Sequence, residues 1–316
     1  MELYDLEKLI KKCGADYVAT RLSLQVQYSA DLMGPGIGSF HLENMERGIK
    51  ILGWVLKLLG LWRRGQTNIR NHKIVHNIVK IRNLHSSFNG LRILHLSDLH
   101  LDVSDDFSAH IGNIVSGQDY DLALLTGDFR FKTYGDYYPA LEAIRKLSGH
   151  LECKHGAYCV LGNHDFLEFV PALEAGGVHA LLNESVRIST DRAGLWLVGL
   201  DDAHFYGVHD YGKAFENVNT SETTILMIHS PETLSEAEKY NPDFIVTGHT
   251  HGGQICFPRG IALWTNCGCD RKYSRGAWEH KGIPGYTSSG AGSSGLPVRF
   301  NCPPEIVIHH LVPSLG

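Results

Sequence analysis

Short apolar segments of this 316-residue sequence are repeatedly followed by side chains that can bind a metal ion. The first such segment, residues 93–96, is followed by Ser97 and then by Asp98-Leu99-His100. An apolar run with a β-branched residue and without Gly or Pro predicts a buried strand. Residues two apart on an extended backbone point to the same side, so we expect Asp98 and His100 to face one site. A carboxylate and an imidazole that lie together are suitable ligands for a divalent metal.

The same arrangement recurs at four later points in the sequence. Strands predicted at 122–125, 157–161, 224–228 and 244–246 are followed by further candidates, which are Asp128, Asn163, His164, His229, His249 and His251. Taken singly, each has a plainer explanation, because a strand-end Asp commonly caps a helix and a lone His is more often a surface or core residue. Five strand ends together favour a metal site, since ligands gather where several strands end on one side of a sheet. Oxygen and imidazole ligands without thiolates suit Mn, Fe or Zn.

The order of these motifs carries a family resemblance. The motifs are D-L-H (98–100), G-D (127–128), G-N-H-D (162–165), H (229) and G-H-T-H (248–251). In this combination they resemble the calcineurin-like metallophosphoesterase superfamily. G-H-T-H-G-G-Q (248–254), with R-F-N-x-P-P-E at 299–305, is similar to its YkuE-like bacterial subgroup. The resemblance extends from about residue 74 to residue 311, and residues 1–65 lie outside it.

The resemblance implies an α/β (α+β) fold, a four-layer α-β-β-α metallophosphoesterase sandwich, around a centre of two divalent metal ions. Manganese is the expected metal, with Zn, Fe and Mg as alternatives. The implied ligands are Asp98, His100 and His251 for the first ion, Asn163, His229 and His249 for the second, and Asp128 for both. The implied mechanism is attack on phosphorus by a metal-bridging hydroxide, with His164 as the catalytic residue that protonates the leaving alkoxide. No substrate-binding residue is identified.

The implied activity is hydrolysis of a phosphodiester or pyrophosphate bond in a small-molecule or lipid-linked substrate. One alternative is a UDP-2,3-diacylglucosamine pyrophosphatase of lipid A synthesis at the membrane surface. Some relatives that cleave this substrate carry Arg where this chain has His164, whereas at least one YkuE-like lineage is thought to catalyse the same reaction. An alternative of another class is a membrane-anchored binding protein with the same fold, but the complete ligand set favours an enzyme.

Residues 43–64 predict a helix with a wide apolar surface. Its non-apolar positions recur at spacings of three and four, and they are Glu46, Lys50, Gly53, Lys57, Gly60 and Arg64. Most of the remaining positions are apolar and include Trp54 and Trp62. Such a helix suits a lipid interface, and equally a contact with the main domain or with a partner chain. We therefore divide the chain into an N-terminal extension (1–65) and a metallophosphoesterase domain (66–316).

Composition limits the remaining possibilities. A formal net charge of −5 argues against a general nucleic-acid-binding protein. The seven cysteines are odd in number and scattered, which predicts reduced thiols. No apolar run is long enough for a membrane span, and residues 1–12 lack the apolar region of a signal peptide. These features predict a cytoplasmic protein, with peripheral contact at the inner face of the cell membrane as an alternative.

Several local expectations can be compared with the structure. Residues 3–13 predict a helix, residues 63–71 a polar linker, and Asn89-Gly90 a hairpin that leads into the strand at residue 93. Residues 306–310 predict a closing strand. We expect Asp165 to orient its own loop and Asp102 to be solvated.

Overall fold

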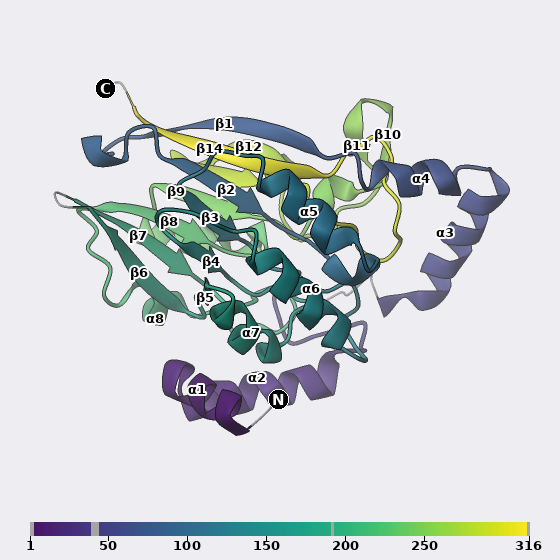
Figure 1. The fold of residues 1–316 in the computed structure, drawn as a ribbon, viewed down its shortest axis with the longest axis horizontal. Coiled ribbons are helices and arrows are strands. Elements are labelled where there is room, and N and C mark those ends of the chain that lie inside the picture. Colours follow the sequence, from purple (N-terminus) through teal and green to yellow (C-terminus); the bar gives the residue numbers. More distant parts are fainter. Residues whose placement is uncertain (1–2, 39–43, 191–192, 315–316) are drawn as a thin grey trace.

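Two six-stranded sheets, packed face to face, form the centre of this computed structural model, which describes residues 3–38, 44–190 and 193–314 (Figure 1). The first sheet has the order β1-β14-β2-β3-β4-β5, and the second has the order β12-β13-β9-β8-β7-β6. The strands of the first sheet are β1 (Lys73–Ile81), β2 (Arg92–Leu96), β3 (Leu122–Leu125), β4 (Ala157–Cys159), β5 (Val178–Ala180) and β14 (Glu305–Pro313). Those of the second are β6 (Glu184–Ser189), β7 (Gly194–Gly199), β8 (Thr223–Met227), β9 (Phe244–Thr247), β12 (Gly276–His280) and β13 (Ile283–Thr287). A separate small hairpin consists of β10 (Cys256–Phe257) and β11 (Ile261–Ala262).

Helices cover both outer faces of this pair of sheets. The helices over the first sheet are α5 (Phe107–Val115), α6 (Tyr138–Ser148) and α7 (Val170–Ala175), and those over the second are α8 (Tyr211–Phe215) and α9 (Leu234–Ala237). Strand β2 illustrates the alternation that builds these layers. Ile93 packs in the core between the sheets, whereas Leu94 and Leu96 pack in the core beneath the helices. The predicted α-β-β-α sandwich is confirmed.

Parallel pairing explains why the candidate ligands meet. Strands β2, β3 and β4 run parallel to one another in the first sheet, and β8 and β9 run parallel in the second. The carboxyl ends of parallel strands lie at one edge of a sheet. The loops that follow these five strands therefore converge.

The expected hairpin at Asn89-Gly90 is wrong. Strand β1 does not pair with β2, because β14 lies between them, parallel to β1 and antiparallel to β2. The closing strand is confirmed as β14, but it occupies an interior position in the sheet. Pairing between the two ends of a domain leaves no local signal in the sequence. Asn-Gly, in contrast, is a local signal for a hairpin, even where none forms.

The N-terminal residues contribute to the main core. The predicted helix at 3–13 is confirmed as α1 (Leu3–Cys13), and an unexpected helix, α2 (Ala15–Tyr28), follows it. Leu9, Cys13 and Val18 are buried in the same core cluster as the residues of α5, α6 and α7. The division of the chain at residue 65 stays a prediction.

The apolar segment at 43–64 is divided between two helices, so the prediction of one continuous helix and of a linker at 63–71 is wrong. Residue 43 lies outside the described residues, α3 spans Glu46–Leu58, and α4 spans Trp62–Asn68. Between them Gly60 has a φ of +68°, a conformation that glycine adopts without strain. Leu56 packs against Leu296 and Val298, whereas much of the apolar surface of α3 remains exposed. Among the described residues, no helix combines the length and apolar character needed to cross a bilayer.

The cysteines differ partly from the expectation of reduced thiols. Cys267 and Cys269 form a disulfide, which two cysteines separated by one residue did not suggest. The remaining five cysteines, which are Cys13, Cys153, Cys159, Cys256 and Cys302, are free.

Candidate metal centre

The loops after five strands bring all the predicted ligands together. Two of the ligands follow β2, one follows β3, one follows β4, one follows β8 and two follow β9; in that order they are Asp98, His100, Asp128, Asn163, His229, His249 and His251. All seven side chains are buried. Burying this many polar and ionisable groups is costly unless they bind one another or a ligand.

The first group of candidate ligand atoms comes from Asp98, His100, Asp128 and His251. Nε2 of His100 lies 3.0 Å from Nε2 of His251, which lies 3.4 Å from Oδ1 of Asp98. Oδ2 of Asp128 is 3.9 Å from Nε2 of His100. Ligands of one ion at about 2.0–2.2 Å are themselves roughly 3–4 Å apart, so this donor set fits a divalent metal.

The second group comes from Asp128, His229 and His249, and Asn163 joins it. Oδ2 of Asp128 is 3.4 Å from Nε2 of His229. Oδ1 of Asn163 is 3.0 Å from that same nitrogen and 3.0 Å from Nδ1 of His249. Asp128 therefore belongs to both groups, as a ligand shared by two neighbouring cations would.

Five of the seven candidates have a backbone that is unusual for residues other than glycine. Their φ angles are positive: 48° for Asp98, 42° for His100, 59° for Asp128, 69° for His249 and 49° for His251. Such conformations cost about 1–3 kcal/mol each and cluster at functional sites. They also correct our reasoning for the D-x-H motif. Strand β2 ends at Leu96, so Asp98 and His100 meet through a left-handed turn and not through strand alternation.

Backbone carbonyls orient three of the four imidazoles. Nδ1 of His100 is 2.6 Å from the carbonyl of Arg130, and Nδ1 of His229 is 2.7 Å from that of Thr126. Nε2 of His249 is 2.5 Å from the carbonyl of Asn266. A nitrogen that donates to a carbonyl fixes the ring so that its other nitrogen faces the cluster, where it can bind a metal once it is unprotonated.

The electrostatics of the cluster centre on Asp128. Burial opposes its ionisation, yet the imidazoles of His229 and His164 hold the pKa of Asp128 well below its usual range. Although burial disfavours the imidazolium, the Asp128 carboxylate raises the pKa of His229 to about 10. Burial raises the pKa of Asp98 to about 6, against the opposing effect of His229. In the metal-free protein, a proton on His229 thus offsets the buried negative charge.

The carboxylate of Asp165 connects two of the ligand loops. It accepts hydrogen bonds from the amide nitrogens of Asp128 (2.7 Å), Phe129 (2.8 Å) and Gly162 (2.9 Å). The bond from Gly162 agrees with the expectation that Asp165 orients its own loop. The bonds from Asp128 and Phe129 extend its contacts to the loop after β3. The expectation that Asp102 is solvated is met only in part, because its side chain is half-buried and its Oδ1 accepts a 2.6 Å hydrogen bond from the amide of Phe131.

The predicted catalytic residue, His164, lies beside Asp128. Nδ1 of His164 is 2.9 Å from the carbonyl of Phe131, to which it can donate. Its Nε2 is 3.8 Å from Oδ2 of Asp128, and its ring meets that of His100 edge to face at 4.8 Å. The ring nitrogen that faces the candidate metal centre is therefore Nε2.

Sequence reasoning missed the residues that support this cluster from behind. His204 packs against His249 with the ring centres 4.0 Å apart, and its Nδ1 is 2.6 Å from Glu232. The buried Arg299 guanidinium lies 3.2 Å from Nδ1 of His251 and donates to backbone carbonyls of the 289–292 loop. Arg299 begins the motif at 299–305, and His204 lies shortly after β7, so both residues carried a usable signal in the sequence.

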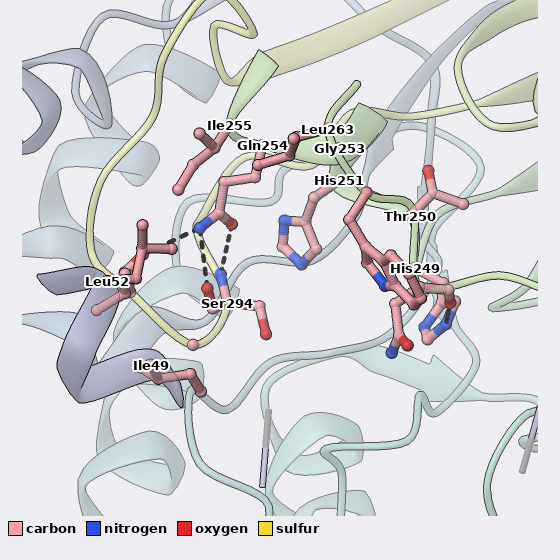
Figure 2. Close-up of a pocket in the computed structure, with 14 residues that line it drawn as sticks. Ile49, Leu52, His249, Thr250, His251, Gly253, Gln254, Ile255, Leu263 and Ser294 are labelled. Carbon is pink, nitrogen blue, oxygen red and sulfur yellow. Dashed lines mark hydrogen bonds between the residues drawn. The ribbon is translucent and has the colours of Figure 1, made fainter. Parts of the chain in front are cut away.

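An apolar cavity of about 170 Å³ opens beside two of the candidate ligands (Figure 2). Its inner end is formed by His249, Thr250 and His251. Its outer walls are contributed by α3 and by the chain around β11. The arrangement suits a substrate with a polar reacting group at the histidines and an apolar group beyond them.

Comparison with known proteins agrees with this geometry. Residues 91–253, more than half of the chain, match the family model described as calcineurin-like phosphoesterase. YkoQ of Bacillus subtilis (strain 168), named as a metallophosphoesterase, is 30% identical over 237 residues, which are 70% of this chain and 83% of YkoQ. A metallophosphoesterase of Helicobacter pylori (strain J99) is 28% identical, covering 86% of this chain and 74% of its own. The metallophosphoesterase YkuE of Bacillus subtilis (strain 168) is 29% identical, with coverage of 71% and 80%.

Proposed function

Because the chain belongs to the calcineurin-like phosphoesterase family and is therefore a metal-dependent phosphoric ester hydrolase, we propose that it hydrolyses a phosphodiester or pyrophosphate bond at a two-metal centre. The observation that carries this proposal is the position of Asp128 in both groups of ligand atoms. Asp98, His100 and His251 would hold one ion, and Asn163, His229 and His249 the other, with Asp128 between them. Manganese is the proposed metal.

When bound, the two cations would lower the pKa of a water molecule and neutralise charge on the phosphate oxygens. The chain's own residues supply the rest. Nε2 of His164 faces the cluster, and a proton held there can pass to the departing alkoxide, which otherwise leaves poorly. The imidazole of His164 is also one of the two that hold the pKa of the Asp128 carboxyl low.

Turnover of a simple diester tests the proposal. Purified protein supplied with Mn²⁺ is expected to hydrolyse bis-p-nitrophenyl phosphate, and a chelator should abolish the reaction until metal is added again. Release of p-nitrophenol, measured on the same sample as its metal content, provides the readout. A panel of cyclic nucleotides, nucleotide-sugar lipids and glycerophosphodiesters would then identify the natural substrate class. Protein that binds metal but cleaves none of these compounds would contradict the proposal.

A second candidate is the UDP-2,3-diacylglucosamine pyrophosphatase of lipid A synthesis, acting in the cytoplasm at the inner face of the cell membrane. The exposed apolar surface of α3 supports this candidate: Trp54 is 63% exposed and Leu58 is 66% exposed. Around them α3 and α4 carry exposed cations, which are Arg47, Lys50, Lys57, Arg63 and Arg64, whereas Glu46 is the single acid of the two helices. Apolar and basic side chains together suit an anionic lipid interface.

This candidate predicts that the protein sediments with phosphatidylglycerol vesicles at low salt. Replacing Trp54 and Leu58 by Glu should lower the bound fraction about tenfold, because two large apolar side chains lose their burial in lipid. Val26→Glu is the matched control, since Val26 is 86% exposed on α2. Wild-type protein that remains in the supernatant, or equal losses in the double variant and the control, would refute the membrane contact.

A further inference from the structure

The cavity beside the metal centre has two walls that come from distant parts of the chain. Ile49 and Leu52 of α3 form one wall, and Leu263 and Trp264, which follow β11, form the other. Figure 2 shows Ile49 and Leu52 on α3 at one side, with Leu263 and His251 across from them. Ile255 and Leu296 complete the apolar lining.

The inner end of this cavity is polar and belongs to the reaction centre. His249 and His251, which are candidate ligands of the two different ions, both line it. A molecule whose phosphate lies at the metal centre can therefore extend any further group from the histidines into the space between the apolar walls.

The side-chain amide of Gln254, which also lines the cavity, is hydrogen-bonded to a neighbouring segment of the lining. Nε2 of Gln254 donates to the carbonyls of Ser294 (2.9 Å) and Leu296 (3.0 Å), and its Oε1 accepts from the amide of Ser294 (2.8 Å). These bonds fix the 294–296 segment against the loop after β9. Gly253 lets the hairpin approach closely, because a Cβ there would lie 2.4 Å from Cβ of Ala262.

Both walls continue outward as exposed apolar surface. Leu263 and Trp264 are 54% and 56% exposed, and the hairpin adds Phe257 and Ile261 at 57% and 55%. Apolar side chains exposed to this extent around a cavity mouth indicate a binding surface, since isolated proteins rarely leave such patches uncovered.

We propose that this cavity binds the alkyl chain of an acylated phosphoester, with the phosphate at the metal centre and the chain between α3 and the β10–β11 hairpin. The inference rests on the proposed function for the position of the phosphate. It assigns Leu52, Leu263 and Trp264 to substrate binding, a role that the motifs did not reveal. The hairpin and α3 thereby act as two sides of one chain-binding site.

Binding of n-alkyl phosphates of increasing length to the Mn²⁺-loaded protein tests this proposal. Below the concentration at which the probes form micelles, each added methylene that enters the cavity should lower Kd about fourfold, until the chain emerges from it. Titration calorimetry measures this dependence without relying on turnover. Leu52→Asp and Leu263→Asp change opposite walls of the cavity at partly exposed positions. Each should weaken the dependence of Kd on chain length. Ile78→Asp is the control, because Ile78 is 68% exposed on β1, away from the cavity lining.

An affinity that does not change with chain length in the wild-type protein would overturn the proposal, as would wall variants that keep the full dependence. A stable dimer that Leu263→Asp dissociates would also overturn it, because the walls would then be a contact between copies. Hydrolysis of bis-p-nitrophenyl phosphate separates the two conclusions. If Kd depends on chain length but the diester is not hydrolysed, the result counts against the proposed function alone. If the diester is hydrolysed but Kd does not depend on chain length, the result counts against the proposed role of the cavity alone.

Discussion

Replacing Asp128 by asparagine is expected to lower turnover of bis-p-nitrophenyl phosphate by about 10³-fold or more, because several kcal/mol of transition-state stabilisation depend on both cations. Asn keeps the shape of the side chain and removes its charge. Oδ1 of Asp128 also accepts a 3.0 Å hydrogen bond from the amide of His164, and an amide oxygen can preserve this contact. The loss should therefore come from the shared ligand and not from a displaced loop. Rates in the presence of saturating Mn²⁺ are the measurement.

The same substitution should change the protons that metal binding releases. With its pKa raised to about 10 by Asp128, His229 is protonated at neutral pH and must lose this proton before it can bind a metal. Metal affinity of the wild-type protein should therefore rise with pH up to that value, and more steeply below pH 6, where Asp98 also loses a proton. Asp128→Asn removes the carboxylate that charges His229, so fewer protons should be released. Calorimetric titrations in two buffers of different ionisation enthalpy count them.

A matched control keeps this experiment specific. Asp119 is 93% exposed and contacts only Arg92 at 3.4 Å in the described part of the chain, so Asp119→Asn should leave turnover and proton release unchanged. A variant at position 128 with wild-type turnover would contradict the shared-ligand role. Loss of turnover with unchanged metal stoichiometry would assign Asp128 to another step.

The candidate ligands could be found from the sequence because each directly follows an apolar strand. The chemistry needs Asp, Asn or His at the point where a buried strand emerges, and this local pattern survives in the linear order of residues. The backbone geometry that brings the ligands together could not be inferred from this pattern. Asp98 and His100 were expected on an extended strand, yet both have left-handed backbones, which are uncommon outside glycine even though Asp and His adopt them more often than most residues.

Features that depend on distant pairing were not predictable. Strand β14 separates β1 from β2, so the local Asn-Gly signal indicated a hairpin that does not form. His204 and Glu232 come from separate loops and contact each other, and the ring of His204 packs against that of His249. Helix α2 was not predicted, because its apolar face is narrow and because the sequence alone does not distinguish its buried polar residues from exposed ones. Two of these, Arg21 and Gln25, turn out to face the interior.

Helix α2 reaches the metal-site loops through Arg21, which is fully buried. Its Nε lies 3.1 Å from Oδ2 of Asp201, its Nη2 donates to the carbonyl of Asp165 at 3.0 Å, and its guanidinium covers the ring of Tyr206 at 3.5 Å. Asp201 also accepts a hydrogen bond from Tyr17 of the same helix. Because the carboxylate of Asp165 holds the loops after β3 and β4, we propose that Arg21 is a positioning residue for the metal centre.

Arg21→Met is expected to destabilise the protein by about 3–5 kcal/mol, since it leaves the buried carboxylate of Asp201 without its cation. The midpoint of urea unfolding measures this loss. Adding Asp201→Asn to the same variant should recover part of the stability, because the uncompensated charge is then removed as well. If Arg21 had only a structural role, the substitutions would change the stability and leave Mn²⁺ binding by the folded protein unchanged. Positioning also predicts weaker Mn²⁺ binding in the folded double variant, because the carbonyl of Asp165 still lacks its donor.

Arg145 offers the comparison for Arg21. It pairs with Glu142 at 2.5 Å, but both side chains are more than half exposed, so Arg145→Met should change the free energy of unfolding by less than about 0.5 kcal/mol. If Arg21→Met were equally harmless, the buried network would contribute nothing to stability. If the double variant bound Mn²⁺ as tightly as the wild type, α2 would support the fold without orienting the metal ligands. The two outcomes are separable because one is read from unfolding and the other from metal affinity.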